Sequence, residues 1–256
     1  MTLSNQKLQS LRSLRQKKYR DRSGHYLIEG LRLCEEAVDG PATVLEIIIA
    51  DGQESPRLQQ LLQRAGRRAI PILHTTQANM DRLCDTDTPQ AVAALVAKAS
   101  PCRPDDTSAN ERLILAVDQL QDPGNLGTLL RTADWFGVKT VLISRDSVDL
   151  YNPKVVRASM GSIFRLTCCT EVEMRPTLAR LRERGYRLLA AVTDAAAPLT
   201  LNVEKTVLLV GNEANGISAG LVELADHRFT IPRLGGGESL NAAIAAGIAL
   251  YELTKR

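Results

Sequence analysis

The sequence DQLQDPGNLGTLLRTADWFGV, at residues 118–138, leads from the end of an apolar run into a helical pattern. The run before it is apolar almost throughout, which is typical of a parallel strand covered on both faces. Gly124, Asn125 and Gly127 lie at the turn into the helix, and Arg131 follows one to two turns later. A helix start offers free backbone N–H groups and a positive potential, so this turn suits an anion. Because no Lys-Ser/Thr pair follows the glycines, a triphosphate-binding loop is not expected.

Similar apolar runs recur along the second half of the chain, and helical patterns lie between them. This alternation predicts an α/β domain with a doubly wound parallel sheet, which binds ligands at the carboxyl ends of its strands. The predicted strands are 113–118, 139–144, 186–192, 206–211 and 227–232. The predicted helices are 126–136, 153–160, 175–184, 217–224 and 239–254, with Ser239 as the N-cap of the last.

A second strand-to-helix turn is LLVGNEANGIS, at residues 208–218. Gly211 and Gly216 permit positive φ angles and let a ligand approach the backbone closely. The carboxylate of Glu213 is placed to accept hydrogen bonds from a ribose hydroxyl or a base amine. Taken alone, this loop fits an ordinary turn as well as it fits a site.

A third such loop is IPRLGGGESLNAAIAAGIALYEL, at residues 231–253. Its three consecutive glycines are costly to order in a plain loop. Ser239 and Asn241 follow at the mouth of a helix of small residues, which permits close packing of the backbone. The alternative is a flexible linker before an ordinary helix.

The first part of the chain has shorter strand and helix patterns behind a basic arm. We expect strands at 43–50, 69–74 and 90–97, and helices at 56–66 and from Thr76 to Leu83. The stretch SPCRPDDTSANE, at residues 100–111, is typical of an interdomain linker. We therefore predict a smaller α/β domain at residues 1–105 and a larger one at residues 106–256.

The N-terminal end is basic, while the whole chain carries only +3. Residues 1–33 hold eight Lys and Arg against two Asp and Glu, a net charge of +6. This favours a polyanionic partner, with a solvated basic helix as the alternative. The aromatic content of 4% argues against a surface of stacked aromatics. No apolar run reaches the roughly 18 residues of a membrane span, and the N-terminus lacks the pattern of a secretory signal.

Cysteine and histidine patterns predict neither a disulfide framework nor a metal site. The five cysteines are scattered without a CxxC pair, so we expect reduced thiols in the cytoplasm. The three histidines lie far apart in the sequence and have no spacing typical of metal ligands.

Taken together and in this order, the three loops resemble the three motifs of the SpoU/TrmH family of SPOUT-class RNA methyltransferases. The resemblance covers residues 112–256. YRDRSGHYLIEGLRLCEEAV, at 19–38, is more loosely similar to the family's N-terminal substrate-binding domain. NPKVVRASMGSIFRL, at 152–166, is similar to the stretch between the first two motifs.

The resemblance implies a parallel-sheet SPOUT domain whose C-terminal segment threads a trefoil knot, beside a small RNA-binding α/β domain. It also implies a homodimer with the final helix at its interface, and S-adenosylmethionine as cofactor without a metal. The reaction implied is methylation of a ribose 2′-hydroxyl, in ribosomal RNA first and in transfer RNA second. The implied cofactor contacts are Gly211, Ile231 and Leu240, with Thr193, Asn212, Glu213 and Asn241 nearby.

The resemblance also assigns roles to side chains. Arg131 matches the arginine that the family is proposed to use as a base or as a positioning group bound to phosphate. A guanidinium keeps its proton far above neutral pH, which favours the positioning role. The expected catalytic set is Arg131, Asn125, Glu213, Ser239 and Asn241, and the expected RNA contacts are Lys17, Lys18, Arg20, Arg22 and Arg157. Ala214, Arg233 and Ala242 depart from the family pattern, which leaves the target nucleotide open.

Two other functions of this fold are compatible with the same residues. One is an enzyme that modifies a base, and the other is a non-catalytic RNA-binding or ribosome-assembly protein. The long N-terminal part resembles ribosomal-RNA enzymes more than the compact transfer-RNA ones, so ribosomal RNA is the expected substrate.

Overall fold

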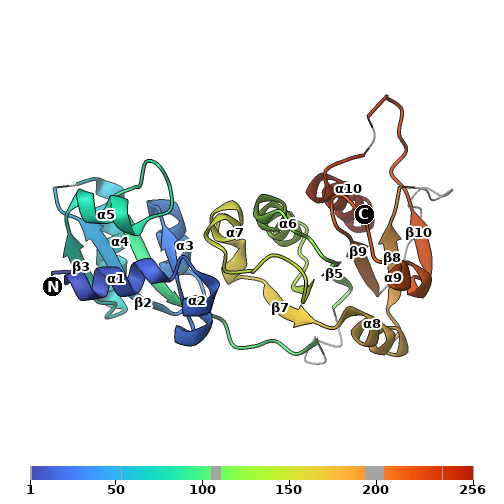
Figure 1. Ribbon diagram of the computed structural model, residues 1–256, viewed down its shortest axis with the longest axis horizontal. Coiled ribbons are helices and arrows are strands. Elements are labelled where there is room, and N and C mark those ends of the chain that lie inside the picture. The colour runs from blue at the N-terminus through green and yellow to red at the C-terminus, as the bar shows by residue number, and fades with distance from the viewer. Residues whose placement is uncertain (1, 53, 105–110, 194–204, 238, 256) are drawn as a thin grey trace. The chain divides into compact units, whose positions relative to one another are not determined.

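The computed structural model describes residues 2–52, 54–104, 111–193, 205–237 and 239–255. The chain divides into two compact units, Met1–Ser100 with Tyr151–Arg165, and Pro101–Leu150 with Leu166–Arg256 (Figure 1). The first unit therefore includes a segment that lies between two strands of the second unit in sequence. The expected domain boundary between residues 105 and 106 lies outside the described residues and stays a prediction. That prediction did not include Tyr151–Arg165 in the first domain.

The first unit is built on a four-stranded sheet of order β1-β4-β2-β3, in which β4 runs antiparallel to β1 and β2, and β3 is parallel to β2. The strands are β1 (His25–Glu29), β2 (Val44–Ala50), β3 (Ile72–Thr75) and β4 (Val92–Ala97). The helices are α1 (Asn5–Ser13), α2 (Lys17–Ser23), α3 (Leu31–Asp39), α4 (Pro56–Arg67), α5 (Gln77–Leu83) and α7 (Pro153–Ala158). Ser55 and Thr76 cap α4 and α5 with their side chains, which confirms Thr76 as a helix start.

The segment Tyr151–Arg165 packs tightly against the rest of the first unit. Arg165 forms an ion pair of 2.6 Å with Glu36 of α3. Gly161 has a φ of 93°, and a Cβ added to it would lie 2.9 Å from the Cβ of Glu36. A residue with a side chain is therefore excluded there by both backbone conformation and space.

The second unit holds a six-stranded sheet of order β10-β8-β9-β5-β6-β7 in which every neighbouring pair is parallel. Its strands are β5 (Leu113–Val117), β6 (Thr140–Ser144), β7 (Thr167–Val172), β8 (Arg187–Ala191), β9 (Thr206–Val210) and β10 (His227–Phe229). Its helices are α6 (Pro123–Trp135), α8 (Met174–Glu183), α9 (Ala219–Leu224) and α10 (Ala242–Thr254). A 3₁₀ helix at Ser162–Phe164 lies between β6 and β7 in sequence but belongs to the first unit. The predicted doubly wound parallel α/β domain is confirmed.

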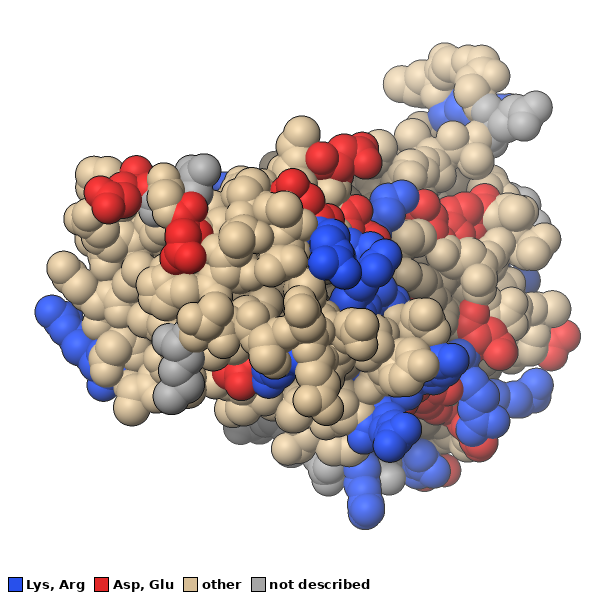
Figure 2. Space-filling view, turned by 60° about the vertical axis from the view of Figure 1, so that its left-hand side comes forward, with Lys and Arg blue, Asp and Glu red and all other residues tan. Residues whose placement is uncertain are grey.

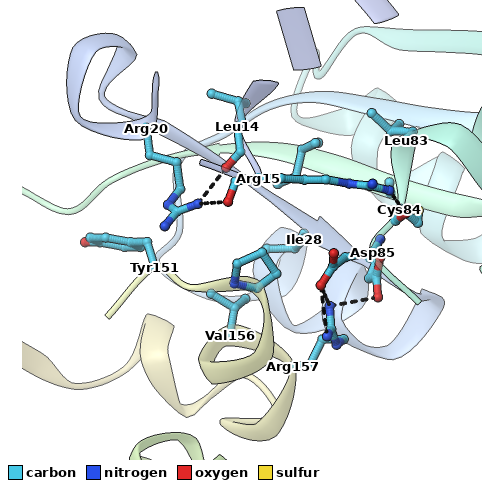
Figure 3. A pocket seen from close by; sticks show the side chains of 14 residues that line it. Leu14, Arg15, Arg20, Ile28, Leu83, Cys84, Asp85, Tyr151, Val156 and Arg157 are labelled. Atoms are coloured by element: carbon cyan, nitrogen blue, oxygen red, sulfur yellow. Dashed lines mark hydrogen bonds and ion pairs between the residues drawn. The ribbon is translucent and has the colours of Figure 1, made fainter. Parts of the chain in front are cut away.

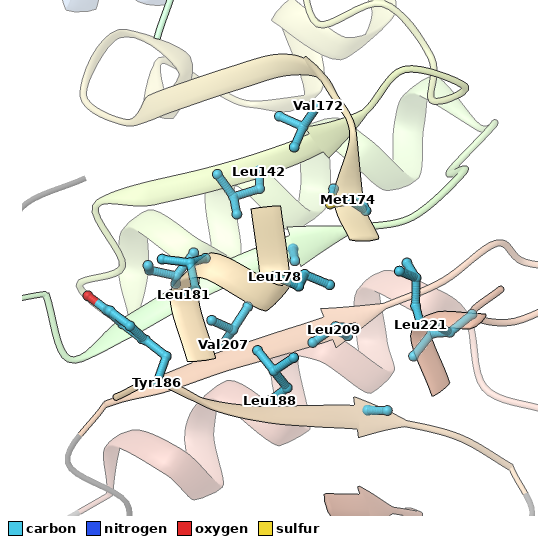
Figure 4. Packing of buried hydrophobic residues seen from close by; sticks show 14 of the residues in the cluster. Leu142, Val172, Met174, Leu178, Leu181, Tyr186, Leu188, Val207, Leu209 and Leu221 are labelled. Carbon is cyan, nitrogen blue, oxygen red and sulfur yellow. The ribbon is translucent and has the colours of Figure 1, made fainter. Parts of the chain in front are cut away.

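Apolar side chains cover both faces of this sheet. On one face, Leu178 and Leu181 of α8 and Leu221 of α9 pack on strand residues such as Leu188 and Val207 (Figure 4). On the other face, α10 packs against α6 and β8 (Figure 1). The carboxyl ends of the strands are thus held on a rigid layered base, where ligands of such sheets bind.

Two expectations about this unit are wrong. The last helix begins at Ala242 with Asn241 as its N-cap, not at Ser239, because the Asn241 carboxamide accepts the free N–H groups of Ala243 and Ile244. Reduced thiols are contradicted for one pair, since Cys102 and Cys169 are joined by a disulfide. Cys34, Cys84 and Cys168 are free.

Within the described residues, no helix has both the length and the apolar character that crossing a membrane requires.

Candidate active site

The three loops found in the sequence meet at the carboxyl edge of the six-stranded sheet. The first follows β5, the second follows β9, and the third leads into α10. Because the carboxyl ends of parallel strands share one edge, side chains that are far apart in sequence come together there.

A chain of hydrogen bonds joins one side chain from each loop. The Nδ2 of Asn125 donates to Oε1 of Glu213 at 2.9 Å, and the Nδ2 of Asn241 donates to Oδ1 of Asn125 at 2.8 Å. A carboxylate only accepts, so it turns the amide nitrogen of Asn125 toward Glu213 and leaves the amide oxygen for Asn241. Three of the predicted catalytic residues therefore form one connected group.

Glu213 also holds the backbone at the entrance to α6. Its two carboxylate oxygens accept from the N–H groups of Gln121 at 3.4 Å and Asp122 at 3.2 Å. Burial raises the pKa of Glu213, but hydrogen bonds from the Asn125 side chain and from backbone N–H groups outweigh it and lower the pKa overall. Glu213 thus stays ionised at neutral pH, which suits an acceptor that fixes Asn125 and makes it a weak base.

The loop that carries Glu213 is unusually tight. Asn212 and Gly216 exchange two backbone hydrogen bonds of 2.8 and 2.9 Å. A Cβ at Gly211 would lie 2.2 Å from the carbonyl carbon of Gly216, so only glycine fits. The Oδ1 of Asn212 accepts from the N–H groups of Ala214 and Asn215, which gives the loop its turn.

Arg131 lies on α6, six residues beyond Asn125, with an exposed side chain. It makes no hydrogen bond or ion pair with any residue that the structure describes. A guanidinium in this state is available to bind a phosphate in a bidentate manner.

Two predicted RNA contacts have internal partners instead, around a pocket of the first unit (Figure 3). Arg20 is only 3% exposed and donates to the C=O groups of Leu14 and Arg15 at 2.7 and 2.8 Å. Arg157 forms ion pairs of 3.2 Å with Glu29 and 3.4 Å with Asp85. Both side chains therefore stabilise the first unit.

The remaining predicted RNA contacts, Lys17, Lys18 and Arg22, are exposed on α2. On the face drawn in Figure 2, basic side chains (blue) are interspersed with acidic ones (red). The exposed cations of α2 therefore indicate a site for RNA more specifically than the net charge of the chain does.

The backbone is open at two of the predicted cofactor positions. Neither the N–H nor the C=O of Ile231 and Leu240 is bonded to a residue within the described ranges. Free donors and acceptors of this kind match the polar edge of an adenine, so the residues present fit an adenosyl group. The C=O of Thr193 accepts from the Thr230 hydroxyl at 3.5 Å, while Ser239 is exposed and makes no bond to a described residue.

The structure adds polar residues that the sequence analysis did not select. The Oγ of Ser144 accepts a hydrogen bond from the N–H of Gln119 at 2.8 Å, and the Oγ of Ser147 accepts one from the N–H of Leu120 at 3.2 Å. These two bonds hold the backbone of the first loop in place. Asp118 is buried beside Ser218. The polar residues that end the β5 and β6 runs were the only sequence signal for them.

Comparison with known proteins identifies the family to which the two parts of the chain are similar. Residues 112–251 match the SpoU rRNA Methylase family, and residues 5–94 match the MRM3-like substrate binding domain. A 23S rRNA (guanosine(2553)-2'-O)-methyltransferase of Bacillus subtilis (strain 168) is 32% identical over 252 residues, which cover 97% of this chain and 96% of that protein.

Solved structures give the same result. The AdoMet-bound rRNA methyltransferase from Sinorhizobium meliloti is 29% identical, with a TM-score of 0.86 over 99% of this chain and 96% of its own. The SpoU methyltransferase AviRb from Streptomyces viridochromogenes, in complex with AdoMet, is 26% identical, with a TM-score of 0.86 over 98% of this chain and 97% of its own. The family match spans more than half of the sequence, and the chain therefore belongs to the SpoU rRNA methylase family of RNA methyltransferases.

Proposed function

We propose that this protein transfers the methyl group of S-adenosylmethionine to a ribose 2′-hydroxyl of ribosomal RNA. The observation that carries the proposal is the bonded chain Glu213–Asn125–Asn241, which has the exposed Arg131 on the same helix as Asn125. It gathers the three loops into one site that can hold a ribose beside a phosphate.

The chemistry needs alignment more than acid catalysis. S-adenosylmethionine supplies, when bound, a methyl group on a positively charged sulfur that is electrophilic without help from a metal. The chain must hold the 2′-oxygen in line with that methyl group, so that the C–O bond would form as the methyl–sulfur bond breaks and the hydroxyl proton passes to solvent. Such positioning removes a large part of the barrier to a bimolecular reaction. In this proposal Arg131 binds the neighbouring phosphate and polarises the hydroxyl, because a guanidinium holds its proton too firmly to act as a base.

The cofactor is assigned to the backbone of Gly211, Ile231 and Leu240, with Thr193, Asn212 and Asn241 at its edge. The free polar groups of Ile231 and Leu240 support this placement. Ser239 is assigned to the ribose because it is exposed between Leu240 and the glycine run. The trefoil knot stays a prediction from the family resemblance.

Ribosomal RNA is the proposed substrate class, and transfer RNA is the alternative. Support comes from relatives that match nearly the whole chain, a 23S rRNA methyltransferase and an rRNA methyltransferase among them. Residues 5–94 match the MRM3-like substrate binding domain, which supports a role of the first unit in RNA recognition. The relatives named are bacterial proteins, so we place the reaction in the cytoplasm.

Replacing Lys17, Lys18 and Arg22 together with glutamine is expected to weaken RNA binding and to flatten its salt dependence. Each lost phosphate contact lowers the slope of log K against log salt by about 1. The measurement is RNA affinity between low and moderate salt. Arg67→Gln, an exposed change on α4, serves as the control. An unchanged slope in the triple variant would remove α2 from the RNA-binding surface.

We also propose that α10 forms the interface of a homodimer. Ile244, Ile248 and Tyr251 recur at helical spacing and are 55%, 38% and 55% exposed, which is unusual for a stripe of large apolar side chains. Burying this stripe against a second copy would remove it from water.

Ile248→Asp is therefore expected to give a monomer in sedimentation equilibrium, because a carboxylate buried in the interface would lack a partner. Ile248→Leu keeps the apolar surface and should remain a dimer. A dimer that survives Ile248→Asp would contradict the interface.

The proposed function is tested by transfer of a labelled methyl group from S-adenosylmethionine to three pools: protein-free ribosomal RNA, ribosomal subunits and transfer RNA. Label in either of the first two supports the proposal, and label only in transfer RNA supports the alternative. If calorimetry finds no binding of S-adenosylmethionine and no pool is labelled, the proposal fails.

A further inference from the structure

A buried carboxylate lies at the end of β5, next to the site but outside the bonded chain. Asp118 follows β5 directly and is 5% exposed. Its Oδ2 accepts a hydrogen bond of 2.8 Å from the N–H of Ser218 and one of 2.5 Å from the Ser218 hydroxyl. The two residues are 100 positions apart, so this contact ties the end of β5 to the start of α9.

Ser218 gives up a local role to make this contact. It occupies the N-cap position of α9, where a serine oxygen ordinarily accepts a backbone N–H from the first turn. The Ser218 side chain makes no capping bond, whereas Ser4, Ser55 and Thr76 cap their helices in the ordinary way. Residues whose side chains depart from a local preference such as N-capping are expected mainly at functional sites. The bond from Ser218 to Asp118 therefore indicates a functional role for this contact.

The backbone of Asp118 holds the other end of the same loop. Its N–H donates to the C=O of Val210, the last residue of β9, at 2.8 Å. Asp118 is therefore bonded both to Val210, which directly precedes the loop Gly211–Ser218, and to Ser218, which ends it. Gln119 adds a third contact, since its C=O accepts from Nδ2 of Asn212 at 2.8 Å. Its φ of 54° is one that non-glycine residues adopt where their surroundings impose it.

We infer that Asp118 is a positioning residue that fixes the width of the loop Gly211–Ser218 and thereby the affinity for the cofactor. Gly211 packs directly against Gly216 and Ile217. A shift of the loop end at Ser218 would therefore pass to Gly211 and to the Glu213 that holds Asn125. Asp118 itself is buried and acts through Ser218. This inference rests on the proposed function, since it concerns the proposed cofactor loop.

The test is the Kd of S-adenosylmethionine by calorimetry, together with the thermal midpoint, in Asp118→Ala, Asp118→Asn and Ser218→Ala. Loss of a hydrogen bond to a charged group predicts that Asp118→Ala weakens cofactor binding by about tenfold to a hundredfold. Ser218→Ala keeps the backbone donor and should have a smaller effect. Asp118→Asn keeps an acceptor oxygen and should restore part of the affinity. In kinetics, KM for the cofactor should rise more than kcat falls.

Asp226→Ala is the matched control for a purely structural role. Asp226 also accepts a hydrogen bond from a backbone N–H, that of Leu188 at 2.9 Å, and forms an ion pair with Arg182. Leu188 lies near the amino end of β8, whereas the site lies at the carboxyl ends of the strands. It should lower the thermal midpoint and leave the Kd unchanged. If Asp118→Ala behaves like Asp226→Ala, the inference is overturned.

If Asp118→Ala does not fold, Ser218→Ala and Asp118→Asn decide, and a wild-type Kd in both overturns the inference. If the wild-type protein itself binds no S-adenosylmethionine, the proposed function fails, which is a different result from variants that bind like wild type.

Discussion

Arg131→Ala is expected to lower kcat/KM for methyl transfer by about a hundredfold to a thousandfold, the range for losing a preorganised group that stabilises the transition state. The reason is that Arg131 is the exposed cation of α6 and has no bond to the described residues, so that it is free for substrate. Binding of S-adenosylmethionine should stay at the wild-type level, because none of the residues assigned to the cofactor lies in the first loop.

Arg131→Lys separates charge from geometry at the same position. A lysine keeps the charge but lacks the planar fork of donors, so it should recover RNA affinity better than turnover. Arg187→Ala is the matched control, since Arg187 is an exposed arginine at the amino end of β8. Turnover that is equal in the Arg131→Ala and Arg187→Ala variants would contradict a catalytic role for Arg131.

Gly211→Ala is expected to abolish measurable binding of S-adenosylmethionine and to destabilise the second unit. The added Cβ would lie within 2.3 Å of the Gly216 carbonyl carbon and oxygen and the Ile217 nitrogen. All three are backbone atoms of the same loop, so no side-chain rotation can relieve the overlap. The loop must open, which separates Glu213 from Asn125. Calorimetry and thermal unfolding measure the two effects.

Gly235→Ala provides the comparison in the third loop. A Cβ at Gly235 has no heavy atom within 4 Å, and the added methyl should be tolerated. Cofactor affinity and thermal stability close to wild type are expected. If the Gly211→Ala variant bound the cofactor normally, the loop Gly211–Ser218 would not be part of the cofactor site.

The sequence predicted those parts of the fold that leave a local pattern. The apolar runs at β5, β6 and β9 were recognisable because every residue but one in these strands is buried, as in a parallel sheet covered on both sides. The strand β7 was missed because most of its residues lie at least partly open to solvent, and β1 was missed because it directly follows the basic helices. Short strands of mixed burial carry little periodic signal.

The site was predictable in its members but not in its connections. Asn125, Glu213 and Asn241 were selected from their loops, whereas the bonds between them depend on how strands far apart in sequence are ordered in the sheet. The pairing of Asp118 with Ser218 and of Arg157 with Glu29 joins residues at least 100 positions apart, for which a single sequence has no local sign.

We conclude that the enzyme, through these three loops, methylates a ribose hydroxyl and not a base. The most direct measurement is complete alkaline hydrolysis of ribosomal RNA that the protein has labelled with S-adenosylmethionine, followed by identification of the labelled products. A 2′-O-methyl group blocks cleavage at its own nucleotide, so the claim predicts label in alkali-resistant dinucleotides. Label in single nucleotides would show that a base is methylated and would contradict the claim.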